Sequence, residues 1–193
     1  MTVLEIVADV ASRLESLGIR YAIGGSLASS AWGQMRQTND ADIEVYLSPS
    51  HIEPLTEAFH DPYLLSKSEL QNAVESAAPF RSVQLINMDE AFKVDLFLLD
   101  DSEYSMSELD RVVTVNISGT TPLKLLAPEN IVIAKLRWFQ LGNQVSDRQW
   151  NDIVSVLETQ RGMLDIEYLS AWSRQFLVSD LLDQALSEVD GST

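Results

Sequence analysis

The sequence contains no cysteine, which excludes disulfide bonds, thiolate metal sites and thiol nucleophiles. Histidine is almost as rare, since His51 and His60 are the only two. Neither has around it the spacing of a metal site or of an Asp-His-Ser triad. We therefore expect both histidines to be structural or surface residues and look for chemistry elsewhere.

Basic residues are also scarce. The chain has 13 Lys and Arg against 29 Asp and Glu, which gives a formal net charge of −16. The basic residues are scattered, so the sequence predicts no broad nucleic-acid-binding patch. Such a charge opposes non-specific binding to phosphate backbones, although it leaves room for a small local patch, and it favours a cationic partner or substrate.

Long apolar runs are missing as well. No run approaches membrane-spanning length, and residues 1–5 carry none of the positive charge typical of a secretory leader. We therefore expect a cytoplasmic protein with no membrane partner. A content of 46% hydrophobic and 22% charged residues is typical of a folded globular chain. The length of 193 residues suits one domain, or a small domain with an appended helical one.

The most informative stretch, residues 21–47, predicts a strand, a glycine turn, a helix and a second strand. Its first apolar run stops at Gly24-Gly25-Ser26, where two glycines can adopt positive φ and the serine can cap a helix. Apolar residues then recur at the helical period as far as Met35. From Asp40 the period changes to two, which predicts a strand.

Three carboxylates share one face of that second strand, because Asp40, Asp42 and Glu44 alternate with apolar residues. Like charges this close repel unless a cation lies between them, and oxygen-only ligands suit Mg²⁺ or Mn²⁺. The glycine turn supplies the complementary half, since backbone N–H groups at a helix N-terminus bind phosphate oxygens. Together they predict a nucleoside-triphosphate site; the simpler alternative is a turn followed by a solvent-facing acidic strand.

The spacing of these residues carries a family resemblance. Gly25-Ser26 followed after thirteen residues by Asp40-Ala41-Asp42-Ile43 resembles the signature of the DNA polymerase β-type nucleotidyltransferase superfamily. Arg36-x-Thr38-x-Asp40-Ala41-Asp42 resembles its bacterial abortive-infection (AbiEii-like) toxin branch. The resemblance implies that Ser26 and the Gly24-Gly25 backbone hold the triphosphate, while Asp40 and Asp42 hold the metal. A rival register would pair Asp42 with Glu44.

A third acid lies farther along the chain. Residues 80–86 and 92–99 are two β-rich runs around the turn 87–90, which predicts an antiparallel hairpin. Asp95 stands alone among apolar residues in the second run, where an unpaired carboxylate would be costly. The resemblance implies that Asp95 is the third metal ligand or the base toward the attacking hydroxyl. The alternative is an edge-strand aspartate that points to solvent.

The C-terminal part of the sequence is helical in pattern. Helices are expected from Pro128 to Gly142, from Ser146 onward, over 165–176 and over 179–186. Lys135 lies among apolar residues, and a single ammonium there can reach a triphosphate. Asp152 follows Arg148 by four residues, so a salt bridge within the helix is the plain interpretation. The resemblance implies instead that Lys135 and Asp152 are catalytic.

The predicted fold is α+β, with a nucleotidyltransferase-like mixed β-sheet flanked by helices over residues 1–120 and an α-helical subdomain over 121–193. Residues 61–79 are expected to form a variable loop with helical character at 70–74. The predicted function is metal-dependent transfer of a nucleoside monophosphate from a nucleoside triphosphate to an acceptor hydroxyl, on RNA or on an aminoglycoside-like small molecule. The alternative is a non-catalytic nucleotide-binding protein of the same fold, paired with a cognate toxin or antitoxin.

Overall fold

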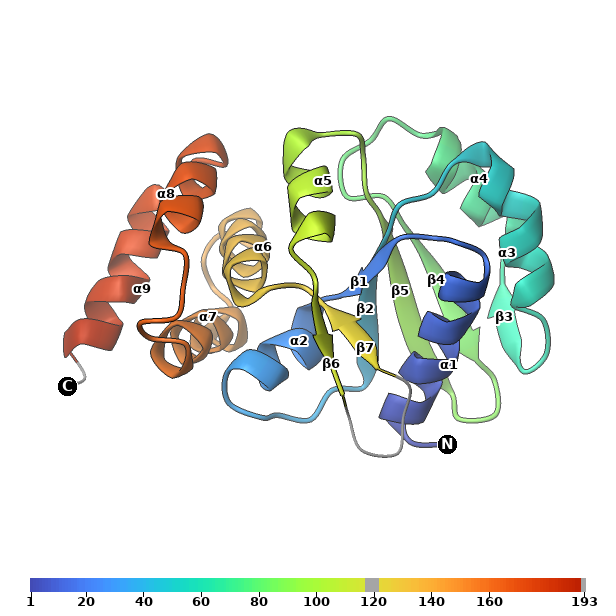
Figure 1. Cartoon of the computed structure of the whole chain (residues 1–193), viewed down its shortest axis with the longest axis horizontal. Coiled ribbons are helices and arrows are strands. Elements are labelled where there is room, and N and C mark those ends of the chain that lie inside the picture. The colour runs from blue at the N-terminus through green and yellow to red at the C-terminus, as the bar shows by residue number, and fades with distance from the viewer. Residues whose placement is uncertain (117–121, 192–193) are drawn as a thin grey trace. The chain divides into compact units, whose positions relative to one another are not determined.

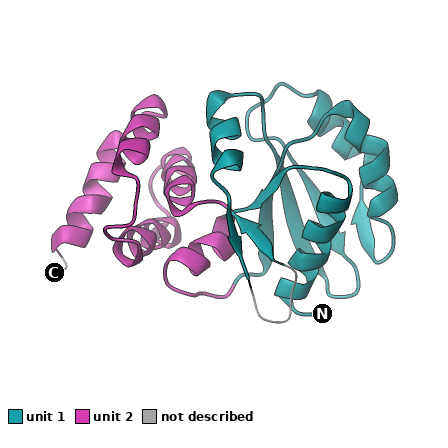
Figure 2. Cartoon of the chain, in the orientation of Figure 1, with its two compact units in different colours: residues 1–24, 38–125 teal, residues 25–37, 126–193 magenta. Residues whose placement is uncertain are grey.

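The computed structural model describes residues 1–116 and 122–191, which form two compact units (Figures 1 and 2). Unit 1 comprises residues 1–24 and 38–125, and unit 2 comprises residues 25–37 and 126–193. The domain boundary expected between residues 120 and 121 lies outside the described residues, so that division of the chain stays a prediction.

Unit 1 contains the β-sheet and the helices around it (Figure 1). In chain order its elements are α1 (Val3–Ser16), β1 (Tyr21–Ile23), β2 (Asp40–Val45), the 3₁₀ helix η1 (Pro49–His51), α3 (Ile52–Ala58), β3 (Tyr63–Leu65), α4 (Lys67–Glu75), β4 (Ser82–Asn87), β5 (Phe92–Leu98), α5 (Glu103–Asp110), β6 (Val113–Val115) and β7 (Leu123–Leu125).

The described strands form one mixed sheet in the order β3-β4-β5-β2-β1-β7-β6. Strand β2 runs parallel to β5, and β1 runs parallel to β7, while the other neighbouring pairs are antiparallel. The expected hairpin is confirmed as β4 and β5. The predicted α+β class, a mixed sheet flanked by helices with a helical region after it, is also confirmed.

The two faces of the central strands differ in burial. On β2, Ala41, Ile43 and Val45 are buried, whereas the acids between them are half-exposed. Strand β5 alternates in the same way. Helix α1 contributes further buried side chains to the core of unit 1. Its start is fixed by a capping box of Thr2 and Glu5, a pattern that the sequence itself contains. The apolar pattern thus fixes which sheet face is covered and leaves the acids on the other.

One expectation for unit 1 is wrong in part. Residues 61–79 are more regular than the predicted loop, because they contain strand β3 and helix α4. The helix is capped by Ser66, whose Oγ accepts from the Glu69 N–H. A three-residue strand leaves too short a pattern to separate from a loop, and β3 is defined by its pairing with β4.

Unit 2 is helical. Its elements are α2 (Gly25–Trp32), α6 (Pro128–Leu141), α7 (Asp147–Thr159), α8 (Ile166–Gln175) and α9 (Ser179–Gly191). The helices expected from the C-terminal sequence are therefore confirmed, although α9 is longer than predicted. None of the helices in the described part of the chain combines the length and the apolar character that crossing a membrane requires.

Helix α2 ends earlier than the sequence pattern suggests. Met35 lies beyond the helix and is 90% exposed, so it is not part of an apolar helical face. The helix ends at Trp32, and at the next residue, Gly33, an added Cβ would lie 2.6 Å from Ser155 Oγ of α7. The same hydroxyl accepts a hydrogen bond from the Gln34 N–H at 2.6 Å. A close approach of backbone to α7 therefore requires glycine at position 33.

Candidate functional site

The less buried side chains of β2, β5 and β4 lie on one sheet face, which we call the acidic face after Asp40, Asp42, Glu44 and Asp95. Strand register places Asp42 opposite Asp95 on β5, and Asp95 opposite Gln84 on β4. Neighbouring strands are about 4.8 Å apart, and directly opposite residues point to the same side. The structure thus brings together Asp42 and Asp95, which are 53 positions apart in the sequence.

The acidic face also contains a cation that sequence analysis assigned no role. Lys93 lies opposite Asp40 in the β2–β5 register, and its Nζ pairs with Asp95 Oδ2 at 2.6 Å. The hydrogen bond with Asp95 raises the pKa of Lys93 against the opposing effect of burial, and the charges of Asp95, Asp40 and Asp42 add to the rise. Part of the carboxylate repulsion on this face is therefore offset by the protein itself.

The two outer acids of β2 have different surroundings. Thr38 Oγ1 donates to Asp40 Oδ1 at 2.8 Å, which orients that carboxylate. Glu44 lies opposite Phe97, so its neighbour on β5 is an aromatic ring and not an acid. This difference favours the register that uses Asp40 and Asp42 over the rival pairing of Asp42 with Glu44.

The carboxylates of the acidic face are candidate ligands for a metal ion. Within residues 1–116 and 122–191, no three His, Asp or Glu side chains converge closely enough to enclose a metal. However, Mg²⁺ usually takes only one or two protein carboxylates and completes its octahedron with water and substrate phosphates. The facing pair Asp42 and Asp95, with Asp40 beside it, is an all-oxygen donor set of that kind. The donor chemistry fits a hard divalent cation, and the assignment of Asp40, Asp42 and Asp95 as ligands stays a prediction.

The glycine turn has the expected place, at the end of β1 and the start of α2. Gly25 has a φ of 52°, in the region that favours glycine. The Gly24 N–H donates to the Asp42 carbonyl at 2.9 Å. This hydrogen bond joins the turn to β2 and occupies the Gly24 N–H. The N–H groups of Gly25 and Ser26 are therefore the candidate donors to a phosphate at this turn.

A second polar cluster lies within unit 2. Arg36 binds the Asp152 carboxylate through two nitrogens, with Nε 3.0 Å from Oδ1 and Nη2 2.9 Å from Oδ2. Nη2 also donates to Ser26 Oγ. Lys135 Nζ lies 2.8 Å from Asp152 Oδ2 and 3.1 Å from Gln149 Oε1. The predicted residues Ser26, Lys135 and Asp152 are thus joined in one network through Arg36.

This network is largely removed from water, since the side chains of Lys135 and Asp152 are only 5% and 9% exposed. Burial alone would raise the pKa of Asp152, but hydrogen bonds from Arg36 and Lys135 outweigh it and lower the pKa below the usual value. The carboxylate is therefore held by residues from other segments, and the salt bridge to Arg148 suggested by the helical spacing is not what fixes it. Two cations share one carboxylate here.

Arg36 and Lys93 are the residues that sequence analysis underrated. The sequence did indicate a role for Arg36, because an arginine at that spacing is part of the pattern that resembles the family. The indication for Lys93 was weaker: it precedes Asp95 by two residues and so shares its strand face. The partner of Arg36 could not be read from local spacing, because Arg36 and Asp152 are 116 residues apart.

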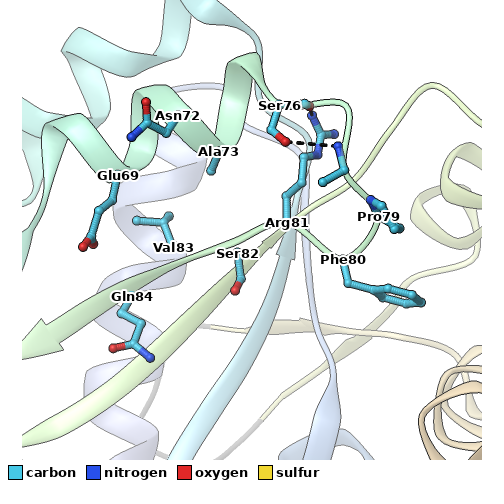
Figure 3. A pocket seen from close by; sticks show the side chains of 11 residues that line it. Glu69, Asn72, Ala73, Ser76, Pro79, Phe80, Arg81, Ser82, Val83 and Gln84 are labelled. Carbon is cyan, nitrogen blue, oxygen red and sulfur yellow. Dashed lines mark hydrogen bonds between the residues drawn. The ribbon is translucent and has the colours of Figure 1, made fainter. Parts of the chain in front are cut away.

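A pocket of about 530 Å³ lies in unit 1, between α4 and β4 (Figure 3). Glu69 and Asn72 of α4 line it together with Ser82 and Gln84 of β4. Gln84 is the strand neighbour of Asp95. The pocket is an open hollow at the surface and not an enclosed cavity. The pocket therefore borders the strand position next to a predicted catalytic acid.

The sequence matches no protein-family model and has no significant match among curated proteins. Solved structures are similar in fold. An antigenic nucleotidyltransferase-like protein from Paracoccidioides brasiliensis has a TM-score of 0.55 and 20% identity, with 97% of this chain and 94% of that one covered. ANT(2")-Ia, solved with adenylyl-2"-tobramycin, has a TM-score of 0.58 and 12% identity, with 89% and 94% covered.

A third similar structure is the lincosamide antibiotic adenylyltransferase LnuA, solved with lincomycin, with a TM-score of 0.51 and 14% identity. The alignment covers 81% of this chain and 96% of LnuA. Likeness at these identities concerns the fold. The chain has a nucleotidyltransferase-like fold over most of its length.

Proposed function

We propose that the chain is a metal-dependent nucleotidyltransferase that moves a nucleoside monophosphate from a nucleoside triphosphate to an acceptor hydroxyl. The observation that carries the proposal is the register of Asp42 and Asp95 on neighbouring parallel strands. Two facing carboxylates, with Asp40 beside them and a glycine turn at the end of the adjoining strand β1, match the needs of a Mg²⁺-bound triphosphate.

In the proposed reaction, the acceptor oxygen forms a bond to the α-phosphorus while the bond to the leaving pyrophosphate breaks. Asp40 and Asp42 would hold the metal, which would neutralise charge that develops on the phosphoryl oxygens. Asp95 would serve as third ligand or would accept the proton of the attacking hydroxyl. Thr38 would keep Asp40 oriented through its hydrogen bond.

The residues of unit 2 are assigned to the triphosphate. The Gly25 and Ser26 N–H groups lie at the N-terminus of an eight-residue helix, which favours anions there. Arg36 and Lys135 place two positive charges on the single carboxylate of Asp152. We assign Lys135 to charge on the leaving pyrophosphate, and Asp152 to holding Lys135 and Arg36 in place.

The acceptor hydroxyl belongs to one of two classes of molecule. A small cationic molecule is favoured by the net charge of −16 and by the pocket that borders Gln84, next to Asp95. Two structures of similar fold were also solved with bound small molecules, ANT(2")-Ia with adenylyl-2"-tobramycin and LnuA with lincomycin. An RNA acceptor in an AbiEii-like toxin system rests on the motif from Arg36 to Asp42 alone.

The test is to incubate the protein and Mg²⁺ with each of four α-labelled triphosphates, and to offer total RNA or a panel of aminoglycosides and lincosamides. The Asp42→Asn variant is the control for contaminating activity. Label in a small nuclease-resistant product supports the antibiotic-type acceptor, and label in nuclease-sensitive material supports the toxin-type acceptor. Triphosphate binding without any transfer would instead favour the non-catalytic protein, paired with a cognate toxin or antitoxin.

A further inference from the structure

The ammonium group of Lys93 lies among the carboxylates proposed to bind the metal. It pairs with Asp95 at 2.6 Å and stands opposite Asp40 in the register. It is also two residues from Asp95 on the same strand face. A single positive charge thus lies where the predicted metal would find its third ligand.

A cation in this position stabilises the face when no metal is bound, because it offsets repulsion between the acids. The same charge opposes a divalent ion at those acids. The energy of two charges at contact distance is on the order of 1 kcal/mol in water and several times larger near a protein surface. Lys93 and the metal are therefore competitors for Asp95.

The position of Lys93 also allows its ammonium group to move away from Asp95. Its side chain is 37% exposed, whereas that of Asp95 is 13% exposed. Lysine has a long flexible stem and three rotatable donors, so its ammonium can change partner without a change in the strand. Phosphate oxygens of a bound nucleotide are suitable new acceptors for that ammonium.

We infer that Lys93 is an internal counter-ion that the metal displaces from Asp95, and that a nucleotide phosphate then receives its ammonium. This inference rests on the proposed function and adds a property to it. Metal alone binds weakly, because displaced Lys93 has lost its partner. Metal and nucleotide bind with positive coupling, because the nucleotide supplies a new one.

The first experiment measures Mn²⁺ binding by calorimetry on wild type and on Lys93→Met, without nucleotide. Removing the competing charge should tighten Mn²⁺ binding about tenfold or more. When the α,β-methylene analogue of ATP or of GTP is present, the difference in Mn²⁺ affinity between wild type and Lys93→Met should become smaller. Lys67→Met is the matched control, since Lys67 pairs with Glu53 on the surface of α3 and α4 and should leave Mn²⁺ affinity unchanged.

The outcomes separate this inference from the proposed function. Equal or weaker Mn²⁺ binding by Lys93→Met, with clear binding by wild type, overturns the counter-ion role and leaves the metal site standing. No Mn²⁺ binding by either protein, with or without nucleotide analogue, overturns both. Lys93→Arg keeps the charge and should retain the weak affinity of wild type.

A second measurement uses only the wild-type protein, so it does not depend on whether Lys93→Met folds. Reductive methylation followed by peptide mass spectrometry reports how accessible each lysine is. Methylation of Lys93 should rise when Mn²⁺ is added and fall again with the nucleotide analogue, while Lys67 and Lys124 serve as internal references. Unchanged methylation of Lys93 at saturating Mn²⁺ would contradict the displacement.

Discussion

Asp42 and Asp95 lie directly opposite each other on the parallel strands β2 and β5. Both side chains occupy the same sheet face, about one strand spacing apart. Two carboxylates at that distance repel, and the Lys93 ammonium on Asp95 offsets only part of this repulsion. This relationship makes the acidic face a site for charge and not for core packing.

The first prediction is that Asp42→Asn removes metal binding without loss of stability. The substitution abolishes one of two facing charges, so the free energy of unfolding without metal should stay equal or rise. Urea unfolding and Mn²⁺ calorimetry on the same protein measure both effects. A loss of about 2 kcal/mol or more, of the size seen when buried interactions are broken, would mean that Asp42 is structural.

The second prediction decides between the two registers of metal ligands. Asp40 is oriented by Thr38 and belongs to the proposed pair, whereas Glu44 lies opposite the ring of Phe97. Asp40→Asn should therefore weaken Mn²⁺ binding at least tenfold, and Glu44→Gln should change it less than threefold. The reverse order in calorimetry would establish the rival pairing of Asp42 with Glu44.

The third prediction concerns the buried network of unit 2. Asp152→Asn removes the carboxylate that Arg36 and Lys135 share and leaves two cations facing each other in a site with little water. Breaking a buried pair in this way costs about 3–5 kcal/mol. Urea unfolding should show that loss.

Adding Lys135→Met to Asp152→Asn tests whether the uncompensated cations cause the loss of stability. It removes one of the two uncompensated cations, so the double variant should recover part of the lost stability, and the coupling follows from a double-mutant cycle. A loss below 1 kcal/mol for Asp152→Asn alone would show that water compensates these charges and that the network contributes little to the fold.

The fourth prediction is a pH dependence specific to Asp152. Its folded-state pKa is lowered, so its ionised form contributes stability that is fully present above the ordinary value of 3.8. That contribution is lost as pH falls through the lower folded-state pKa. The difference in unfolding free energy between wild type and Asp152→Asn should be constant near pH 6 and shrink below about pH 4. A difference that stays constant down to pH 3 would contradict the assignment.

The fifth prediction concerns an RNA acceptor. Within the C-terminal part of the chain, the basic residues available to it beyond Lys135 are Lys124, Arg137, Arg148, Arg161 and Arg174. Three of these already have partners: Lys124 pairs with Glu15, Arg161 pairs with Asp190, and Arg137 stacks on Phe176 at 3.9 Å. Few phosphates can then be neutralised.

The slope of log affinity against log salt for a fluorescent single-stranded RNA should accordingly be shallow, on the order of −2 to −4. Fluorescence anisotropy from 50 to 300 mM salt measures it, and Arg148→Gln should make it shallower by about 0.7. A slope near −8 would reveal a basic surface that neither the sequence nor the described residues indicate.

Local patterns predicted the elements well, and the reasons are physical. The alternation from Asp40 to Val45 fixed strand β2, and the capping box of Thr2 and Glu5 fixed the start of α1. Each depends on residues a few positions apart. Strand β3 was missed because three residues carry too little pattern without knowledge of β4.

The site was harder to predict, because its decisive pairs are distant in sequence. Arg148 is four residues before Asp152 and offered an obvious partner, yet the carboxylate binds Arg36 and Lys135. Lys93 shares a strand face with Asp95, but its position opposite Asp40 on β2 follows only from the pairing of the two strands. Charge balance on a sheet face depends on the register between strands, which no single segment determines.

The position of α2 in the sequence restricts which gene segments can be exchanged by recombination. Residues 25–37 lie inside the sequence of unit 1, yet they belong to unit 2 with α6 and α7. A recombination event that replaced only the C-terminal helices would leave Gly33 without Ser155 and Arg36 without Asp152. An exchange of the C-terminal helices that keeps these contacts must therefore carry two separate gene segments at once.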